Sequence, residues 1–115
     1  MKLINVGSWS FLTGSDIADV VMTCSRELWA ARRVEIATIP FLDDEGRIEE
    51  TQFLIGWANP LSTVSVRYKG PELSDDAAVA DLRRKLVAAG PSNVAAISYS
   101  DTEYPGTGFF DFDEL

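Results

Sequence analysis

The side chains with the most evident capacity for chemistry are carboxylates in residues 41–50, where FLDDEGRIEE holds five acids and one glycine. A helix-loop-helix calcium site needs oxygen ligands at positions one, three and five, glycine at six and a bidentate carboxylate at twelve. If Gly46 takes position six, Phe41 falls on the first ligand position and Gln52 on the last. The segment therefore favours a hairpin tip, in which glycine accepts positive φ and charged side chains face water. The acidic residues of this tip are Asp43, Asp44 and Glu45.

The rest of the composition lacks the usual parts of an active site. The chain has no histidine, which removes Ser-His and Cys-His nucleophile pairs and most transition-metal sites. Its one cysteine, Cys24, lies among apolar residues at helical spacing and is interpreted as a small buried hydrophobe. The glycines form no phosphate-binding motif. We therefore predict no enzymatic activity, with no catalytic, cofactor-binding or metal-binding residues.

The charge of the chain restricts its partners. Eighteen acidic residues against ten basic ones give a formal net charge of -8, which disfavours direct binding to a nucleic-acid backbone. No apolar run approaches the roughly 18 residues that span a bilayer, and the N-terminal residues lack the pattern of a secretory signal. We expect a soluble, cytoplasmic protein that does not enter the membrane.

Local patterns predict the elements that would position these residues. Residues 2–12 indicate two strands joined at Gly7 and Ser8, and residues 13–33 an amphipathic helix. Residues rich in β-branched side chains predict three strands, and a second amphipathic helix and a last strand follow. These segments are 34–42, 51–57, 62–68, 71–91 and 93–99. The predicted fold is α+β, a mostly antiparallel sheet in the order ββαβββαβ with both helices on one face.

Some single residues in these patterns suggest local roles. Thr13 or Ser15 would cap the first helix and Ser74 the second. Arg32 and its neighbour would complement the negative end of the first helix dipole. Pro40 lacks an amide proton, so its strand should be an edge or bulge there.

The last fifteen residues have a composition of their own. Residues 1–100 form one predicted α+β domain, and 101–115 an acidic, aromatic C-terminal tail. This tail would act as a short linear motif or pack on its own domain or on a twin. Its candidate contact residues are Phe109, Phe110, Asp111, Phe112 and Asp113.

Residues 11–60 also carry a resemblance. The stretches GSDIADVVMTCSREL, VEIATIPFLDDEGRIEE and FLIGWANPL resemble small proteins of actinobacteria or their phages. In those proteins an IAD helix precedes a V-x-I-P strand, an acidic glycine turn and an L-I-G strand. The chain departs from that pattern at Trp57, where proline is expected. The resemblance implies an intact domain and contributes no catalytic residue.

Three functions follow as hypotheses. The leading one is a non-catalytic interaction domain that binds a protein partner or itself, as in a homodimer, through Trp57, the acidic tip and the tail. The alternative is an acidic, phage-borne inhibitor or decoy that occupies the nucleic-acid groove of a host protein. The third is a small-molecule-binding domain with a pocket between sheet and helices, using Arg67, Tyr68 or Tyr99.

Overall fold

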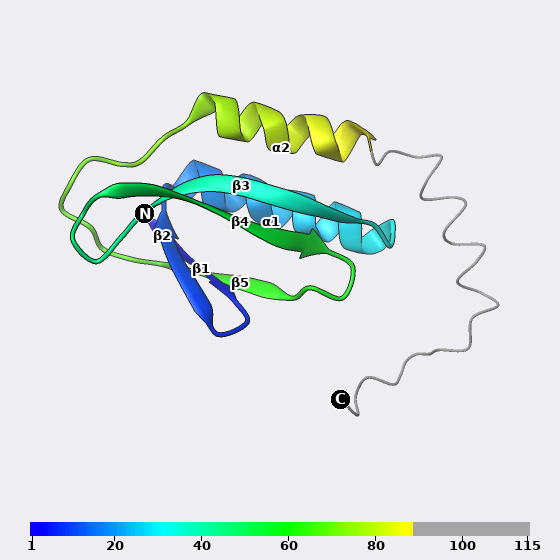
Figure 1. The fold of residues 1–115 in the computed structure, drawn as a ribbon, viewed down its shortest axis with the longest axis horizontal. Coiled ribbons are helices and arrows are strands. Elements are labelled where there is room, and N and C mark those ends of the chain that lie inside the picture. The colour runs from blue at the N-terminus through cyan, green and yellow to red at the C-terminus, as the bar shows by residue number, and fades with distance from the viewer. Residues whose placement is uncertain (89–115) are drawn as a thin grey trace.

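The structure, a computed structural model, describes residues 1–88 and has α+β architecture. Five strands and two helices follow in the order ββαβββα (Figure 1). Their bounds are β1 Lys2–Val6, β2 Trp9–Thr13, α1 Ser15–Ala30, β3 Val34–Leu42, β4 Ile48–Gly56, β5 Leu61–Ser65 and α2 Asp76–Ala88. The antiparallel sheet and both helices were predicted; the last strand, 93–99, and the tail lie outside the described residues.

The sheet has the order β4-β3-β2-β1-β5, and every neighbouring pair is antiparallel. The hairpin β1–β2 turns at Gly7, whose φ is +59°, as the glycine beside serine predicts. The strands β2 and β3 pair at Leu12 and Leu42, near one end of β3. From that point β1 and β2 diverge from the β3–β4 hairpin (Figure 1). The sheet thus has two parts, the strands β5, β1 and β2 and the hairpin β3–β4, which meet at one corner. We call these two parts the ladders.

The helix α1 supplies the centre of the core. Its predicted apolar stripe is confirmed, because Ile17, Val21, Cys24 and Leu28 are all buried. Facing residues from both ladders complete the core, namely Ile4, Ala37, Ile39 and Ile55. Burial of each large aliphatic side chain contributes about 1.5–3 kcal/mol. The same helix therefore holds the two diverging ladders together.

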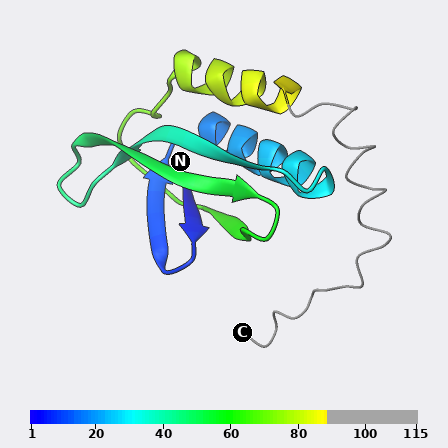
Figure 2. The same cartoon turned by 45° about the vertical axis from the view of Figure 1, so that its right-hand side comes forward.

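The helix α2 packs on α1 and runs beside β3 (Figures 1 and 2). Leu82 is its buried residue, and Val79 and Leu86 are partly buried around it. The ammonium of Lys85 donates a hydrogen bond to the Ile36 carbonyl at 2.5 Å. We predicted that both helices would cover one sheet face; α2 instead packs mainly on the first helix and beside the strand.

The helix caps differ from those predicted. Gly14 is the N-cap of α1 and has no side chain with which to cap it. The Thr13 hydroxyl, which was predicted as a cap, donates instead to the Pro40 carbonyl at 2.8 Å inside the molecule. The Ser15 amide donates instead to the carboxylate of Glu72, far away in sequence.

The cap of α2 is also displaced from its predicted position. The Asp75 carboxylate accepts the Ala78 amide at 3.0 Å, so Asp75 and not Ser74 is the capping residue. Both residue types can cap a helix, and the actual start of α2 at Asp76 selects the residue directly before it.

Candidate interaction surfaces

The acidic segment is the tip of the β3–β4 hairpin. The Asp43 carboxylate accepts the amides of Glu45 and Arg47 at 2.9 and 2.8 Å, and Gly46 has φ +79°. The Arg47 guanidinium pairs with the Glu45 carboxylate. The predicted turn is confirmed, and the carboxylate of Asp43 is engaged in forming it. Over residues 1–88, no three side chains suited to metal binding gather in one place.

A tryptophan cluster lies at the opposite end of the hairpin. The Trp29 and Trp57 rings meet edge to face with centroids 5.6 Å apart. The guanidinium carbon of Arg32 lies 3.8 Å from the centroid of the Trp57 ring, within the range of a cation–π contact. Arg32 therefore contacts Trp57 just after α1, besides any effect on the helix dipole. The sequence pointed to Trp57 as a contact residue but did not predict this contact, which joins the end of α1 to the end of β4.

The open face of β3 and β4 carries an apolar patch on the side opposite the core. Ile36 and Leu54 are directly paired across the two strands, and Val34 lies on the same face two residues before Ile36. Their exposed fractions are 46, 49 and 41%. We call Val34, Ile36 and Leu54 the hairpin patch. Single exposed apolar residues are common, whereas three adjacent ones on a sheet face mark a candidate contact surface.

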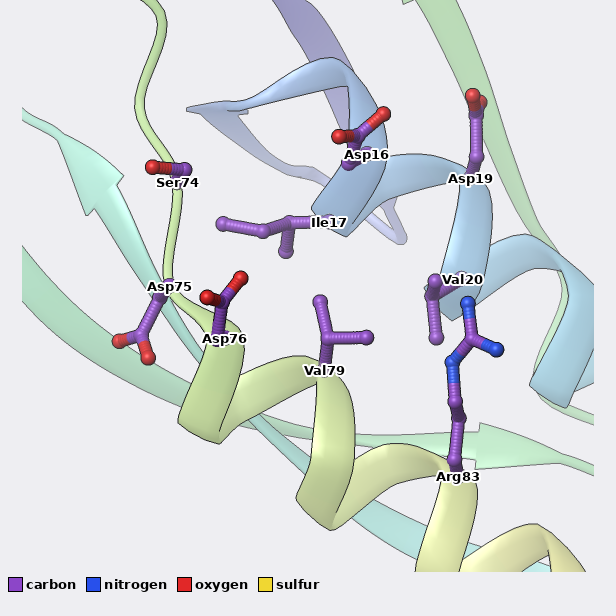
Figure 3. Close-up of a pocket in the computed structure, with 9 residues that line it drawn as sticks. All are labelled: Asp16, Ile17, Asp19, Val20, Ser74, Asp75, Asp76, Val79 and Arg83. Atoms are coloured by element: carbon purple, nitrogen blue, oxygen red, sulfur yellow. The ribbon is translucent and has the colours of Figure 1, made fainter.

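A groove of about 260 Å³ lies between the N-terminal turns of the two helices (Figure 3). Asp16 and Ile17 of α1 line it on one side, and Asp76 and Val79 of α2 line it on the other (Figure 3). The other lining residues are Asp19, Val20, Ser74, Asp75 and Arg83.

Two of the polar side chains of this groove already have structural partners. Asp75 caps α2, and Asp19 pairs with the Lys2 ammonium at 2.6 Å. The third hypothesis places a ligand pocket between sheet and helices, with Arg67, Tyr68 or Tyr99 supplying polar contacts. This groove lies between the helices and contains neither Arg67 nor Tyr68, and Tyr99 lies outside the described residues.

The candidate contact residues are not brought to one place. The acidic tip and Trp57 occupy opposite ends of nine-residue strands, about 30 Å apart at the usual rise per residue. The five candidates in the tail, from Phe109 to Asp113, lie outside the described residues. The hairpin patch was missed, although the alternation of apolar and charged residues in 34–36 is a signal that could have located part of it; residues 53–55 are all apolar and do not show which face is exposed.

Cys24 is placed as a core residue. Its thiol lies 3.6 Å from the Leu82 carbonyl, and burial raises the pKa of the Cys24 thiol, while Arg83 acts in the opposite direction. A buried thiol with a raised pKa is a poor nucleophile.

Comparison of the chain with family models, curated proteins and solved structures gave no match in any of the three. The resemblance to actinobacterial proteins stays a prediction. Neither described helix has the length and apolar character needed to cross a bilayer.

Proposed function

We propose that this chain is a non-catalytic protein-interaction domain whose contact surface is the β3–β4 hairpin. The observation that carries the proposal is the hairpin patch, where Val34, Ile36 and Leu54 stay 41–49% exposed on the face of the sheet opposite the core. Covering such side chains contributes up to about 1.5–3 kcal/mol each, before the cost of association.

The tryptophan cluster supports the same surface. Val34 pairs with Gly56 in the hairpin register, directly before Trp57. Trp29, the ring partner of Trp57, is 39% exposed. Tryptophan and arginine are the residue types most enriched at the energetic centres of interfaces. An apolar patch beside a Trp-Arg stack therefore supports a protein surface as partner.

Photocrosslinking of the full chain tests this function. A photoreactive amino acid replaces Leu54 in one variant and Ser62 in a control, since Ser62 is exposed on β5 and hydrogen-bonded to Asn5. We expect a covalent adduct with a polypeptide, either a second copy or another protein, from position 54 and not from position 62.

A second substitution separates binding from folding. Ile36→Ser should lower the yield of the position-54 adduct while leaving the thermal melt nearly unchanged, because Ile36 is half-exposed. Equal adduct yields from positions 54 and 62, or no adduct at either, would contradict the proposed surface.

A further inference from the structure

The hydrogen-bond pattern of the hairpin determines which groups of β4 face outward. The Asp43 amide donates to the Arg47 carbonyl and the Trp57 amide to the Arg33 carbonyl, both at 2.9 Å. In the register of the hairpin these are pairs of odd-numbered residues, so odd pairs are the hydrogen-bonded ones. The even-numbered residues of β4 therefore direct their N–H and C=O groups away from β3. They are Ile48, Glu50, Gln52 and Leu54.

Two outward-facing carbonyl groups of β3 have hydrogen-bond partners, whereas β4 has no described strand beyond it. On the β3 side, Lys85 donates to the Ile36 carbonyl and Thr13 to the Pro40 carbonyl. The ring nitrogen of Pro40 faces this side. Although β3 is an interior strand of the sheet, β2 pairs with it only at Leu42, so Pro40 interrupts no ladder bond.

The β4 side is a long, regular edge. β4 is the terminal strand of the sheet, and no other described strand lies beyond it. Its nine residues contain no lysine, proline or bulge, three of the devices that prevent strand pairing at an edge, and its charged residues are Glu49 and Glu50. The strand is therefore suited to accept another strand.

We infer that β4 pairs in antiparallel fashion with β4 of a second copy, with Thr51 opposite Thr51 of the second copy. The inference rests on the proposed function and names the partner. The strand reads IEETQFL and is complementary to itself about its centre. Ile48, exposed by 63%, would lie opposite Leu54, exposed by 49%, and the Glu50 carboxylate opposite the Gln52 amide.

Neighbouring registers are less favourable. A slip that places Glu50 opposite Glu50 of the second copy brings two carboxylates together, and a slip that places Gln52 opposite itself puts Glu50 against Leu54. Centring on Thr51 avoids both mismatches. All four outward-facing residues of each strand then exchange backbone hydrogen bonds. The two β3–β4 hairpins form one continuous sheet, which carries both hairpin patches on the same face.

Cysteine crosslinking tests the register in the full chain. In a non-hydrogen-bonded antiparallel pair the two Cα atoms lie about 4.5 Å apart, within the range of a disulfide. Thr51→Cys should yield a disulfide-linked dimer under mild oxidation. The control Ser62→Cys, exposed on β5 at the other edge of the sheet, should yield none at the same concentration. Native Cys24 is buried in both variants.

Charge substitution tests the pairing by a matched design. Gln52→Glu places carboxylates opposite Glu50 twice per dimer and should weaken self-association about tenfold. The control Thr38→Glu changes the direct neighbour of Gln52 on the same face, and disturbs the same 3.2 Å side-chain bond, but lies off the edge. It should leave the dissociation constant within about twofold. The double variant Glu50→Lys with Gln52→Glu should restore association.

Sedimentation at rising concentration measures these constants. The inference is overturned if the chain stays monomeric at millimolar concentration and Thr51→Cys forms no dimer. It is also overturned if the β4 edge pairs with residues 89–115 or with another protein. If position 54 still crosslinks to a different polypeptide, the proposed function survives that result. If neither adduct nor dimer forms, the proposed function falls as well.

Discussion

The backbone conformation of Gly56 and its close neighbours both disfavour a side chain at this position. Its φ is +110°, and a Cβ atom there would lie 2.2 Å from the Arg33 carbonyl oxygen and 2.9 Å from Cβ of Leu28. Gly46 also has positive φ, +79°, yet a Cβ atom there would meet nothing within 4 Å. A comparison of the two positions therefore separates the effect of backbone strain from the effect of steric overlap. Gly56 has to remain small because the end of β4 lies directly against the Arg33 carbonyl and against Leu28 of α1.

We expect Gly56→Ala to be much more destabilising than Gly46→Ala. Left-handed strain alone should lower the free energy of unfolding by about 1–2 kcal/mol in Gly46→Ala. Overlap with backbone adds to this strain in Gly56→Ala, for a loss of about 3 kcal/mol or more. Urea denaturation of both variants measures the difference. Equal losses would mean that the backbone around Arg33 gives way easily.

At the scale of elements, α1 begins on a cap that comes from another part of the chain. The Glu72 carboxylate accepts the Ser15 amide and also contacts the amino group of Met1 at 3.0 Å. The bond from the Ser15 amide, with that from the Met1 amino group, lowers the pKa of the Glu72 carboxyl below its usual value. Gly14 permits this approach, since a Cβ atom there would overlap the Leu73 carbonyl oxygen at 1.7 Å.

The pKa shift of Glu72 predicts how stability depends on pH. A carboxyl whose pKa is lower in the folded state stabilises the fold above its unfolded pKa, about 4.3, and loses that contribution as pH falls through the folded value. Glu72→Gln should therefore lower the free energy of unfolding at neutral pH, and the difference from wild type should shrink below about pH 4.

Denaturation from pH 3 to 7 tests this dependence, with Asp44→Asn at the exposed hairpin tip as control. The control should differ little from wild type across that range. A difference between wild type and Glu72→Gln that is independent of pH would show that the ionised carboxylate is not what stabilises the start of α1.

Local patterns predicted the seven described helices and strands, with different ends for β4 and β5, but not the contacts that connect them. The α1 stripe and the acidic turn depend on residues within a few positions of each other, so periodicity and turn chemistry predicted both. The Glu72 cap and the Arg32–Trp57 stack join residues 57 and 25 positions apart. A sequence pattern does not encode such contacts before the packing is known. The hairpin patch lies between these cases. Its apolar residues could be recognised in the sequence, but the sequence did not show that this face of the hairpin is exposed.

At the scale of the molecule, α2 is weakly attached compared with α1 in the part of the chain that the structure describes. Within the described residues, α1 buries six side chains whereas α2 buries Leu82 alone. The Leu82 side chain joins the core, and its carbonyl lies 3.6 Å from the Cys24 thiol. Segments with few buried contacts open at lower free energy than the rest of a domain. Partial opening of α2 would therefore uncover Cys24 before the two ladders separate.

Leu82→Ala tests this order of opening. The substitution should lower the free energy of unfolding by about 2–5 kcal/mol if α2 unfolds with the rest, and by less if α2 detaches by itself. In the Leu82→Ala variant we expect faster hydrogen exchange in α2 than in α1. We also expect a thiol reagent to label Cys24 faster in the variant than in wild type. The control Val87→Ala lies on the same helix with Val87 exposed by 78%, and should change neither rate. If Leu82→Ala leaves the labelling of Cys24 as slow as in wild type, α2 does not protect the thiol, and the ladders with α1 alone enclose it.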